Sequence, residues 1–201
     1  MGYSIAVFGA FNVHSFGDSL FPEAIYSELQ KRIEIDEFCV FSLGGRKNPY
    51  SDKIVYDYSQ FAEINKTKQF DAIIIGGGEL LHNLPINFPE ENVIYEAGAI
   101  WQIPVKLGIK YKIPIVMNSV GMPYEFKEEN REELEKLFSA ISYISLRDEY
   151  SYQRWIDYFG DSEKAVKVPD SLWNIRDYFT IEKLEASRDS LKEKYKIEKP
   201  Y

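Results

Sequence analysis

Four polar segments carry the side chains that could do chemistry, and each follows a run of apolar residues. The first, residues 9–18, contains an amide, an imidazole and a carboxylate in Asn12, His14 and Asp18. It is longer and more polar than a connection between a strand and a helix needs, which is about 2–6 residues. It is therefore a candidate binding loop. The structural alternative is that Asp18 or Ser19 caps the next helix while Asn12 supports the turn.

The second segment begins with three consecutive glycines, Gly76, Gly77 and Gly78, and continues with Glu79. Glycine lets backbone N–H groups approach a ligand closely, either around an anion or around a sugar. A Walker-type phosphate loop is excluded because no Lys-Ser or Lys-Thr pair follows. Since Glu79 would repel an anion, we expect contact with a neutral or hydroxyl-rich ligand. The alternative is that the glycines form only a tight turn.

The third segment, residues 118–123, contains the small residues Ser119 and Gly121. Small side chains at the end of a strand keep a cleft open for a ligand. The same residues would also serve as an ordinary loop, and the sequence does not decide between the two.

The fourth segment, residues 145–151, contains Arg147 at the predicted end of a strand. A guanidinium in this position can bind a carboxylate or a phosphate through two hydrogen bonds. Asp148 fits the N-cap of the following helix. The alternative for Arg147 is an ion pair with Asp148 or Glu149.

The elements that must position these segments alternate between strands and helices along the chain. Short apolar runs predict buried strands at residues 5–8, 38–43, 53–58, 71–75, 114–117, 143–146 and 165–168. Helical spacing of apolar residues predicts helices at residues 22–32, 101–112, 128–140 and 152–159, the first two with Pro22 and Pro104 in their first turns. This alternation predicts an α/β fold with a mostly parallel sheet and helices on both faces. Ligands bind at the carboxyl ends of the strands in such sheets, so we expect a binding site among the loops that follow the strands.

Composition and charge narrow the class of protein. The 201 residues have a formal net charge of −8, which speaks against nonspecific nucleic-acid binding. Cys39 is the sole cysteine and lies in an apolar run, so we expect a core residue rather than a disulfide or a reactive thiol. The chain has neither an apolar stretch of membrane-spanning length nor a signal-peptide pattern at its start. These features predict a cytoplasmic protein without a membrane-spanning segment.

The polar segments also match a known pattern in order and spacing over residues 3–175. The matching residues are Asn12, Gly17, Asp18, Asp71, Gly76, Gly77, Gly78, Ile144, Ser145, Leu146, Arg147, Asp148, Ser151, Val168, Pro169 and Asp170. This pattern resembles the polysaccharide pyruvyl transferase family. The family's common form is a compact Asn-x-Gly-Asp, which residues 14–16 lengthen here.

The resemblance implies an active site between two Rossmann-like halves, arranged as in GT-B glycosyltransferases. It implies transfer of an enolpyruvyl group from phosphoenolpyruvate onto a sugar, forming a ketal across two hydroxyls, with no metal or organic cofactor. Arg147 would hold the anionic donor, and Asp18 would act as the acid or base. The expected substrate-binding residues are Asn12, His14, Gly17, Gly76, Gly77, Gly78, Ser119 and Gly121.

The resemblance also divides the chain. Residues 1–175 correspond to a Rossmann-like N-terminal domain, and residues 176–201 to a linker and a charged helix leading toward a missing C-terminal domain. We expect one half of such a cleft to bind weakly and catalyse poorly. Two alternatives remain open: a GT-B-like glycosyltransferase that uses a nucleotide sugar, and a non-catalytic domain that binds glycans.

Overall fold

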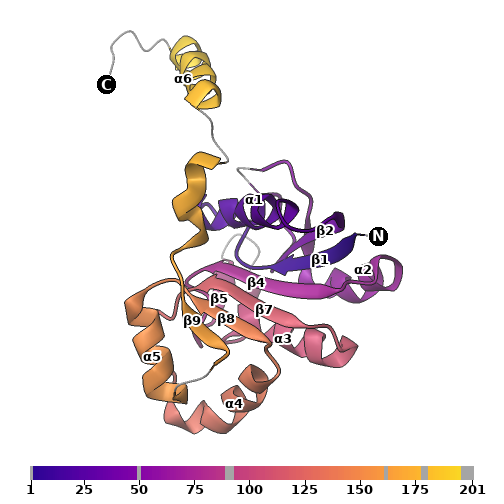
Figure 1. Cartoon of the computed structure of the whole chain (residues 1–201), viewed down its shortest axis with the longest axis vertical. Helices are drawn as coiled ribbons and strands as arrows, with labels where there is room; N and C mark the ends of the chain where they lie inside the picture. The colour runs from indigo at the N-terminus through magenta and orange to yellow at the C-terminus, as the bar shows by residue number, and fades with distance from the viewer. Residues whose placement is uncertain (1, 49–50, 89–92, 161–162, 178–180, 196–201) are drawn as a thin grey trace.

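The fold is a parallel α/β sheet with helices on both faces (Figure 1), as the sequence predicts. The computed structural model describes residues 2–48, 51–88, 93–160, 163–177 and 181–195. Within this part of the chain, seven strands form the main sheet: β1 (Tyr3–Phe8), β2 (Ile35–Ser42), β3 (Val55–Asp57), β4 (Ala72–Gly78), β7 (Ile115–Val120), β8 (Tyr143–Leu146) and β9 (Ala165–Lys167). Their order is β3-β2-β1-β4-β7-β8-β9, and neighbouring strands are parallel.

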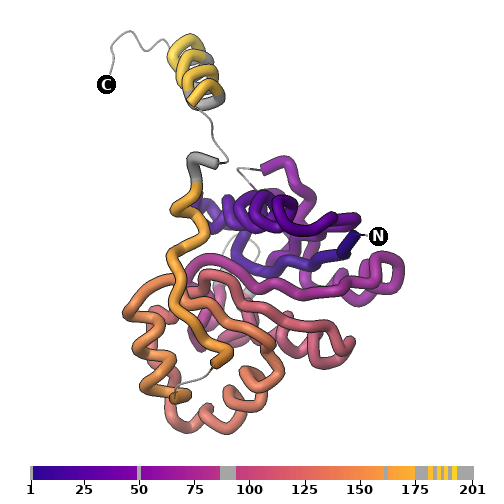
Figure 2. Tube along the Cα trace, viewed as in Figure 1, coloured from indigo at the N-terminus to yellow at the C-terminus, as the bar shows by residue number. Residues whose placement is uncertain are grey.

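The two faces of the sheet are covered by different helices, as Figures 1 and 2 show. The helices are α1 (Phe16–Gln30), α2 (Phe61–Lys68), α3 (Ala99–Tyr111), α4 (Arg131–Ser139) and α5 (Glu149–Phe159). Side chains alternate along a strand, so Ile5 and Val7 pack with residues of α1 in one cluster. Ala6 and Phe8 belong to the larger cluster, which includes residues of α2 to α5. Cys39 is buried in this larger cluster, as predicted.

Aromatic side chains join three of the helices in the larger cluster, α3, α4 and α5. Trp101 of α3 stacks on Phe138 of α4, with ring centroids 5.0 Å apart and planes at 10°. Trp155 of α5 meets the same phenylalanine edge-on at 4.8 Å. Such contacts add to the stabilisation that burial of the rings provides. These contacts hold α3, α4 and α5 together beside strands β7, β8 and β9.

The strand order reverses beside β1. From β1 the chain moves outward to β2 and β3, and then returns to the other side of β1 as β4. The connections after β1 and after β4 therefore leave neighbouring strands toward opposite faces, which opens a crevice at their carboxyl ends. This crevice is where the first two polar segments meet.

The first helix begins six residues earlier than predicted, at Phe16 instead of residue 22. Ser15 is its N-cap, and its hydroxyl accepts a hydrogen bond from the backbone N–H of Asp18 at 3.4 Å. The prediction that Asp18 or Ser19 caps the helix is therefore wrong, as is the placement of Pro22 in the first turn. The cap brings Asp18 into the first turn, at the edge of the crevice.

A similar correction applies to α3, which begins at Ala99, so that Pro104 lies in its second turn. Proline has no N–H to donate to the carbonyl four residues earlier, which belongs to Ile100. The hydroxyl of buried Tyr58 donates to that carbonyl instead, at 2.9 Å. A tertiary contact thus replaces the missing helical hydrogen bond.

Other elements differ from the predicted ranges. Strand β4 continues through the glycines, because Gly76 and Gly78 pair with Asn118 and Val120 of β7. The sequence reasoning missed α2 and the antiparallel hairpin of β5 (Ile86–Phe88) and β6 (Val93–Tyr95). The helix predicted at residues 128–140 begins as a 3-10 turn, η3 (Glu128–Asn130), and continues as α4.

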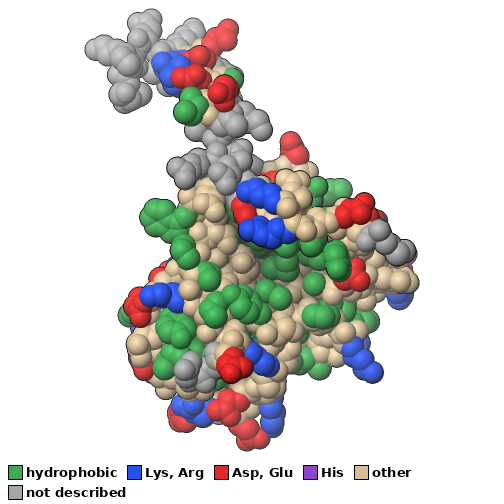
Figure 3. Space-filling model, in the orientation of Figure 1, with side chains coloured by type: hydrophobic (Ala, Val, Ile, Leu, Met, Phe, Trp, Pro, Cys, Tyr) green, Lys and Arg blue, Asp and Glu red, His purple; other side chains and the backbone are tan. Residues whose placement is uncertain are grey.

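The last described segments are a 3-10 helix, η4 (Ser171–Asp177), and α6 (Ile181–Tyr195). Leu172 of η4 packs against the cluster beneath α1, so η4 belongs to the body of the fold. Helix α6 stands away from the sheet (Figure 1) and carries side chains of both charges (Figure 3). Residues 178–180 and 196–201 of the predicted linker region lie outside the described residues, and the division at residue 175 stays a prediction. Among the described helices, none is long and apolar enough to cross a membrane.

Candidate functional site

A cavity of about 290 Å³ lies at the carboxyl end of the sheet, beside the first turn of α1. The residues that line it are Ser15, Gly17, Asp18, Phe21, Glu79, Arg147, Asp170 and Leu172. They come from the segments after β1, β4, β8 and β9. The fold thus brings Gly17, Asp18 and Arg147, which the sequence singled out in two distant segments, into one cavity.

Arg147 is the cation of this cavity and is surrounded by carboxylates. Its Nη2 lies 2.8 Å from Oε1 of Glu79, its Nε 3.3 Å from Oδ2 of Asp148, and its Nη1 3.9 Å from Oδ2 of Asp170. Asp148 also caps α5, as predicted, by accepting the N–H of Ser151 at 2.7 Å. The ion pair expected with Asp148 is therefore present, but two further carboxylates from other segments join it.

The expected alternative partner, Glu149, turns away from Arg147 and pairs with Lys167 of β9. Glu149 is the first residue of α5, so its side chain leaves the helix on a different side from that of the N-cap residue Asp148. Of the two partners that the alternative named for Arg147, Asp148 is therefore the one that forms the pair.

Asp18 is the half-buried carboxyl of the cavity. Burial raises the pKa of its carboxyl above the ordinary value of 3.8, because removal from water disfavours the charged form. A hydrogen bond with Ser15 and the charge of Arg147 lower this pKa, whereas the charges of Glu79 and Asp170 raise it further. The net shift is upward. A carboxyl with a raised pKa is a better proton acceptor and donor near neutral pH than an ordinary one.

Gly77 and Gly78 give space to side chains of α1. Both have positive φ, +78° and +85°, which favours glycine. A Cβ on Gly77 would collide with the ring of Phe21, and a Cβ on Gly78 would collide with the carboxylate of Asp18. The glycines therefore let Asp18 lie against the end of β4. Their predicted contact with substrate stays a prediction, as does that of Gly76, which pairs with β7.

Gly121 serves Arg147 in the same way. A Cβ on Gly121 would lie 2.8 Å from Nε and 3.1 Å from Cζ of Arg147, too close for an ordinary contact. The backbone N–H of Gly121 donates to the carbonyl of Gly78 at 2.8 Å. Gly78, which lies against Asp18, and Gly121, which lies against Arg147, are thus joined by a backbone hydrogen bond. This bond links the backbone beside the acid to the backbone beside the cation.

Ser119 holds the segment after β9 against β7. It is 1% exposed with φ of +53°, a conformation that costs free energy for a residue with a side chain. Its N–H donates to the hydroxyl of Ser145 at 2.8 Å, and its own hydroxyl lies 2.7 Å from that of Ser171. Ser171 follows Asp170, so this contact fixes the carboxylate opposite Arg147. Substrate contact by Ser119 stays a prediction.

Two of the predicted residues, Asn12 and His14, do not line the cavity. Asn12 is buried, and its Nδ2 donates to the carbonyl of Leu43 at 2.8 Å, the turn-supporting role considered from the sequence. His14 is exposed and does not line the cavity. Gly17 lies at the rim, where a Cβ would come no closer than 3.8 Å to Leu172.

Sequence reasoning did not assign Glu79, Asp170, Phe21 or Leu172 to the site. Asp170 was part of the matched pattern, and Glu79 follows the three glycines. The sequence therefore placed both residues near the predicted site but assigned neither of them a role. The cavity lining therefore contains three carboxylates, those of Asp18, Glu79 and Asp170, and one guanidinium, that of Arg147. This balance suits a ligand rich in hydroxyl groups. Within the described residues, no three His, Cys, Asp or Glu side chains are grouped as ligands of one metal ion.

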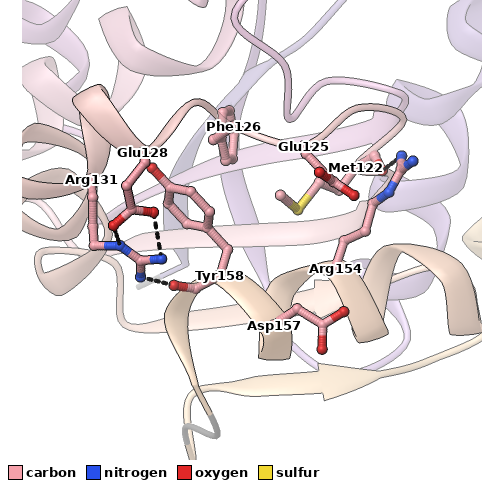
Figure 4. Close-up of a pocket in the computed structure, with 8 residues that line it drawn as sticks. All are labelled: Met122, Glu125, Phe126, Glu128, Arg131, Arg154, Asp157 and Tyr158. Carbon is pink, nitrogen blue, oxygen red and sulfur yellow. Dashed lines mark hydrogen bonds and ion pairs between the residues drawn. The ribbon is translucent and has the colours of Figure 1, made fainter.

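A second cavity of about 310 Å³ lies between the connection after β7 and the outer face of α5 (Figure 4). Arg131 lies over the ring of Tyr158, 4.3 Å from its centroid, and pairs with Glu128. Arg154 donates to the carbonyl of Met122 at 3.1 Å. Both guanidinium groups are thus used within the protein. Their contacts hold the connection that begins at Gly121.

The fold belongs to the class of parallel α/β sheets with a switch point in the strand order, and the cavity lies at the carboxyl ends of the strands, where proteins of this class bind ligands. A family model for polysaccharide pyruvyl transferase matches residues 16–200. The chain therefore belongs to the polysaccharide pyruvyl transferase family, which confirms the resemblance of its motifs. The family is one of transferases, and its name gives a polysaccharide as acceptor. No curated protein matches the chain significantly.

Proposed function

We propose that the cavity at Asp18 and Arg147 takes part in transfer of a pyruvyl group from phosphoenolpyruvate to a sugar of a polysaccharide. The observation that carries this proposal is the meeting of one carboxyl of raised pKa and one guanidinium in a cavity of a chain of this family. An acid or base and an anion-binding group are what the reaction requires of the protein.

The reaction has a defined balance of atoms. Two hydroxyl oxygens of the sugar form bonds to the carbon that carries the phosphate in phosphoenolpyruvate, and the bond from that carbon to the phosphate oxygen breaks. One hydroxyl proton ends on the methylene carbon, which becomes a methyl group, and the other leaves with inorganic phosphate. Asp18 accepts a hydroxyl proton in this scheme, and Arg147 holds the carboxylate or phosphate of the donor.

The charges of the cavity suit the sugar acceptor better than they suit the anionic donor. Three carboxylates and one guanidinium line it, so a hydroxyl-rich acceptor is favoured over an isolated anion. A donor with both a carboxylate and a phosphate needs cations beyond Arg147. The expectation that a second domain supplies them stays a prediction, as does the GT-B-like arrangement of two halves.

The test combines binding and turnover of the chain with phosphoenolpyruvate and an oligosaccharide acceptor. Titration measures donor binding, and NMR detection of the ketal methyl group together with phosphate release measures transfer. We expect Arg147→Ala to weaken donor binding by about tenfold to a hundredfold, the effect of losing a hydrogen-bonded charged group.

Arg188→Gln provides the matched control, because Arg188 lies on α6 and pairs with its neighbour Asp189. It removes the same charge far from the cavity and should leave donor binding unchanged. Unchanged binding in Arg147→Ala would contradict the assignment of Arg147. Binding of UDP- or GDP-sugars in place of phosphoenolpyruvate would favour the glycosyltransferase alternative.

A further inference from the structure

The three carboxylates around Arg147 are not held equally. Asp148 is anchored as the N-cap of α5, where it accepts the N–H of Ser151. Asp170 is anchored by the N–H of Leu172, which donates to its Oδ1 at 2.9 Å. Each of these two carboxylates has a fixed backbone partner in addition to Arg147. Neither can leave the guanidinium without giving up that hydrogen bond.

Glu79 differs from both. Its side chain is 61% exposed, against 44% for Asp148 and 23% for Asp170, and within the described residues it accepts a hydrogen bond from Nη2 of Arg147 at 2.8 Å. It has a longer side chain than aspartate, and in the part of the chain that the structure describes no backbone N–H donates to its carboxylate. An exposed ion pair of this kind contributes little to stability, so Glu79 can leave Arg147 at low cost.

We infer that Glu79 occupies the position on Arg147 that an anionic substrate takes, and that it sets the affinity for that substrate by having to be displaced. This inference rests on the proposed function, in which Arg147 binds a carboxylate or phosphate. Asp148 and Asp170 stay in place during the exchange and keep the guanidinium oriented. Glu79 thereby lowers the affinity for any anion that does not bring enough binding groups to replace it.

The experiment compares Glu79→Gln with the unaltered chain by titration at low ionic strength, using phosphoenolpyruvate and, separately, inorganic phosphate as probes. Glutamine keeps the size of the side chain and removes the charge. We expect both anions to bind about fourfold to tenfold more tightly, as removal of one charge at this separation predicts. The gain should vanish in the double variant Glu79→Gln with Arg147→Gln.

Glu132→Gln is the matched control. Glu132 pairs with Lys136 on α4 at 2.7 Å, so this substitution also removes one acidic charge and frees one cation, but on the surface of a distant helix. It should leave anion affinity unchanged. Equal gains in Glu79→Gln and Glu132→Gln would overturn the inference, because they would reflect net charge alone.

The outcomes separate this inference from the proposed function. If Glu79→Gln strengthens phosphate binding through Arg147 while phosphoenolpyruvate shows no preference over phosphate, the inference stands and the assigned donor is wrong. If phosphoenolpyruvate binds through Arg147 with the same affinity in both chains, the donor assignment stands and the inference is overturned. Absence of anion binding by Glu79→Gln at the highest soluble concentration also overturns it.

Discussion

The raised pKa of the Asp18 carboxyl favours proton transfer but lowers the stability of the folded chain at neutral pH. Burial raises the pKa of its carboxyl, so the folded state holds the charged form less readily than the unfolded state does. A group of this kind leaves stability intact below its unfolded pKa, near 3.8, and reduces stability as the pH rises through its folded pKa. The property that suits Asp18 for proton transfer therefore destabilises the fold at neutral pH.

Asp18→Asn should accordingly raise the melting temperature at neutral pH while reducing transfer by about a hundredfold to ten-thousandfold, the usual loss of a general acid or base. The gain in melting temperature should shrink as the pH falls toward 3.8, where the wild-type carboxyl is also neutral. Thermal unfolding across this pH range measures it. Asp157→Asn, at an exposed position of α5, should show no such trend. A stability gain independent of pH would contradict the role assigned to burial.

Gly121 tests how closely the backbone must approach Arg147. Gly121→Ala should move the guanidinium, because the new Cβ would lie 2.8 Å from Nε, and should weaken anion binding more than it lowers stability. Gly17→Ala is the control, since its Cβ would have 3.8 Å of space at the rim of the same cavity. Titration and thermal unfolding of both variants give the comparison. Equal binding by the two variants would mean that Arg147 has room to adjust.

The residues of the site were only partly predictable. Arg147 stood out because it follows an apolar run, where a parallel sheet exposes its ligand site, and Asp18 because it matches the Gly-Asp pair of the family pattern. The partners of Arg147 were not predictable, because Glu79 is 68 positions away in sequence and reaches it only through the pairing of β4 with β7 and of β7 with β8. Local spacing indicates which side chains lie at strand ends but not which of them touch.

At the scale of elements, α3 shows how a helix with an internal proline is completed by another segment. Tyr58→Phe removes the hydroxyl that donates to the Ile100 carbonyl and should cost about 1–3 kcal/mol of unfolding free energy, the penalty of an unsatisfied buried group. In a Pro104→Ala background the new backbone N–H can bond that carbonyl, so the same substitution should cost less. Chemical denaturation of the four chains measures this coupling. An equal loss in both backgrounds would contradict it.

Helix positions were predicted better than helix starts. Apolar spacing located α1 and α3, but proline was read as a marker of the first turn, where it is most common. Ser15 and Gly98 begin these helices earlier, and in α3 the hydroxyl of Tyr58 donates to the carbonyl that Pro104 leaves without its helical partner. A prediction from one residue's usual position fails when tertiary contacts compensate for the missing N–H.

At the scale of the whole molecule, the alternation of buried strands with helices was enough to predict the sheet and its covered faces. The strands of a parallel sheet are buried on both sides, so they are recognisable as short apolar runs. The hairpin β5–β6 and helix α2 escaped because they are short and lie beside the sheet rather than in it. The acidic cavity, in contrast, depends on four connections that only the complete fold brings together.

The close contact of Gly121 with Arg147 has an evolutionary consequence. A larger residue at position 121 displaces the guanidinium of Arg147, whose atoms are the nearest to the added Cβ, so the two positions form an epistatic pair. Because these atoms are the far end of a flexible side chain, the cost of a change at 121 falls on the position of the charge rather than on the fold. Related sequences that keep arginine at this position should keep glycine at its partner.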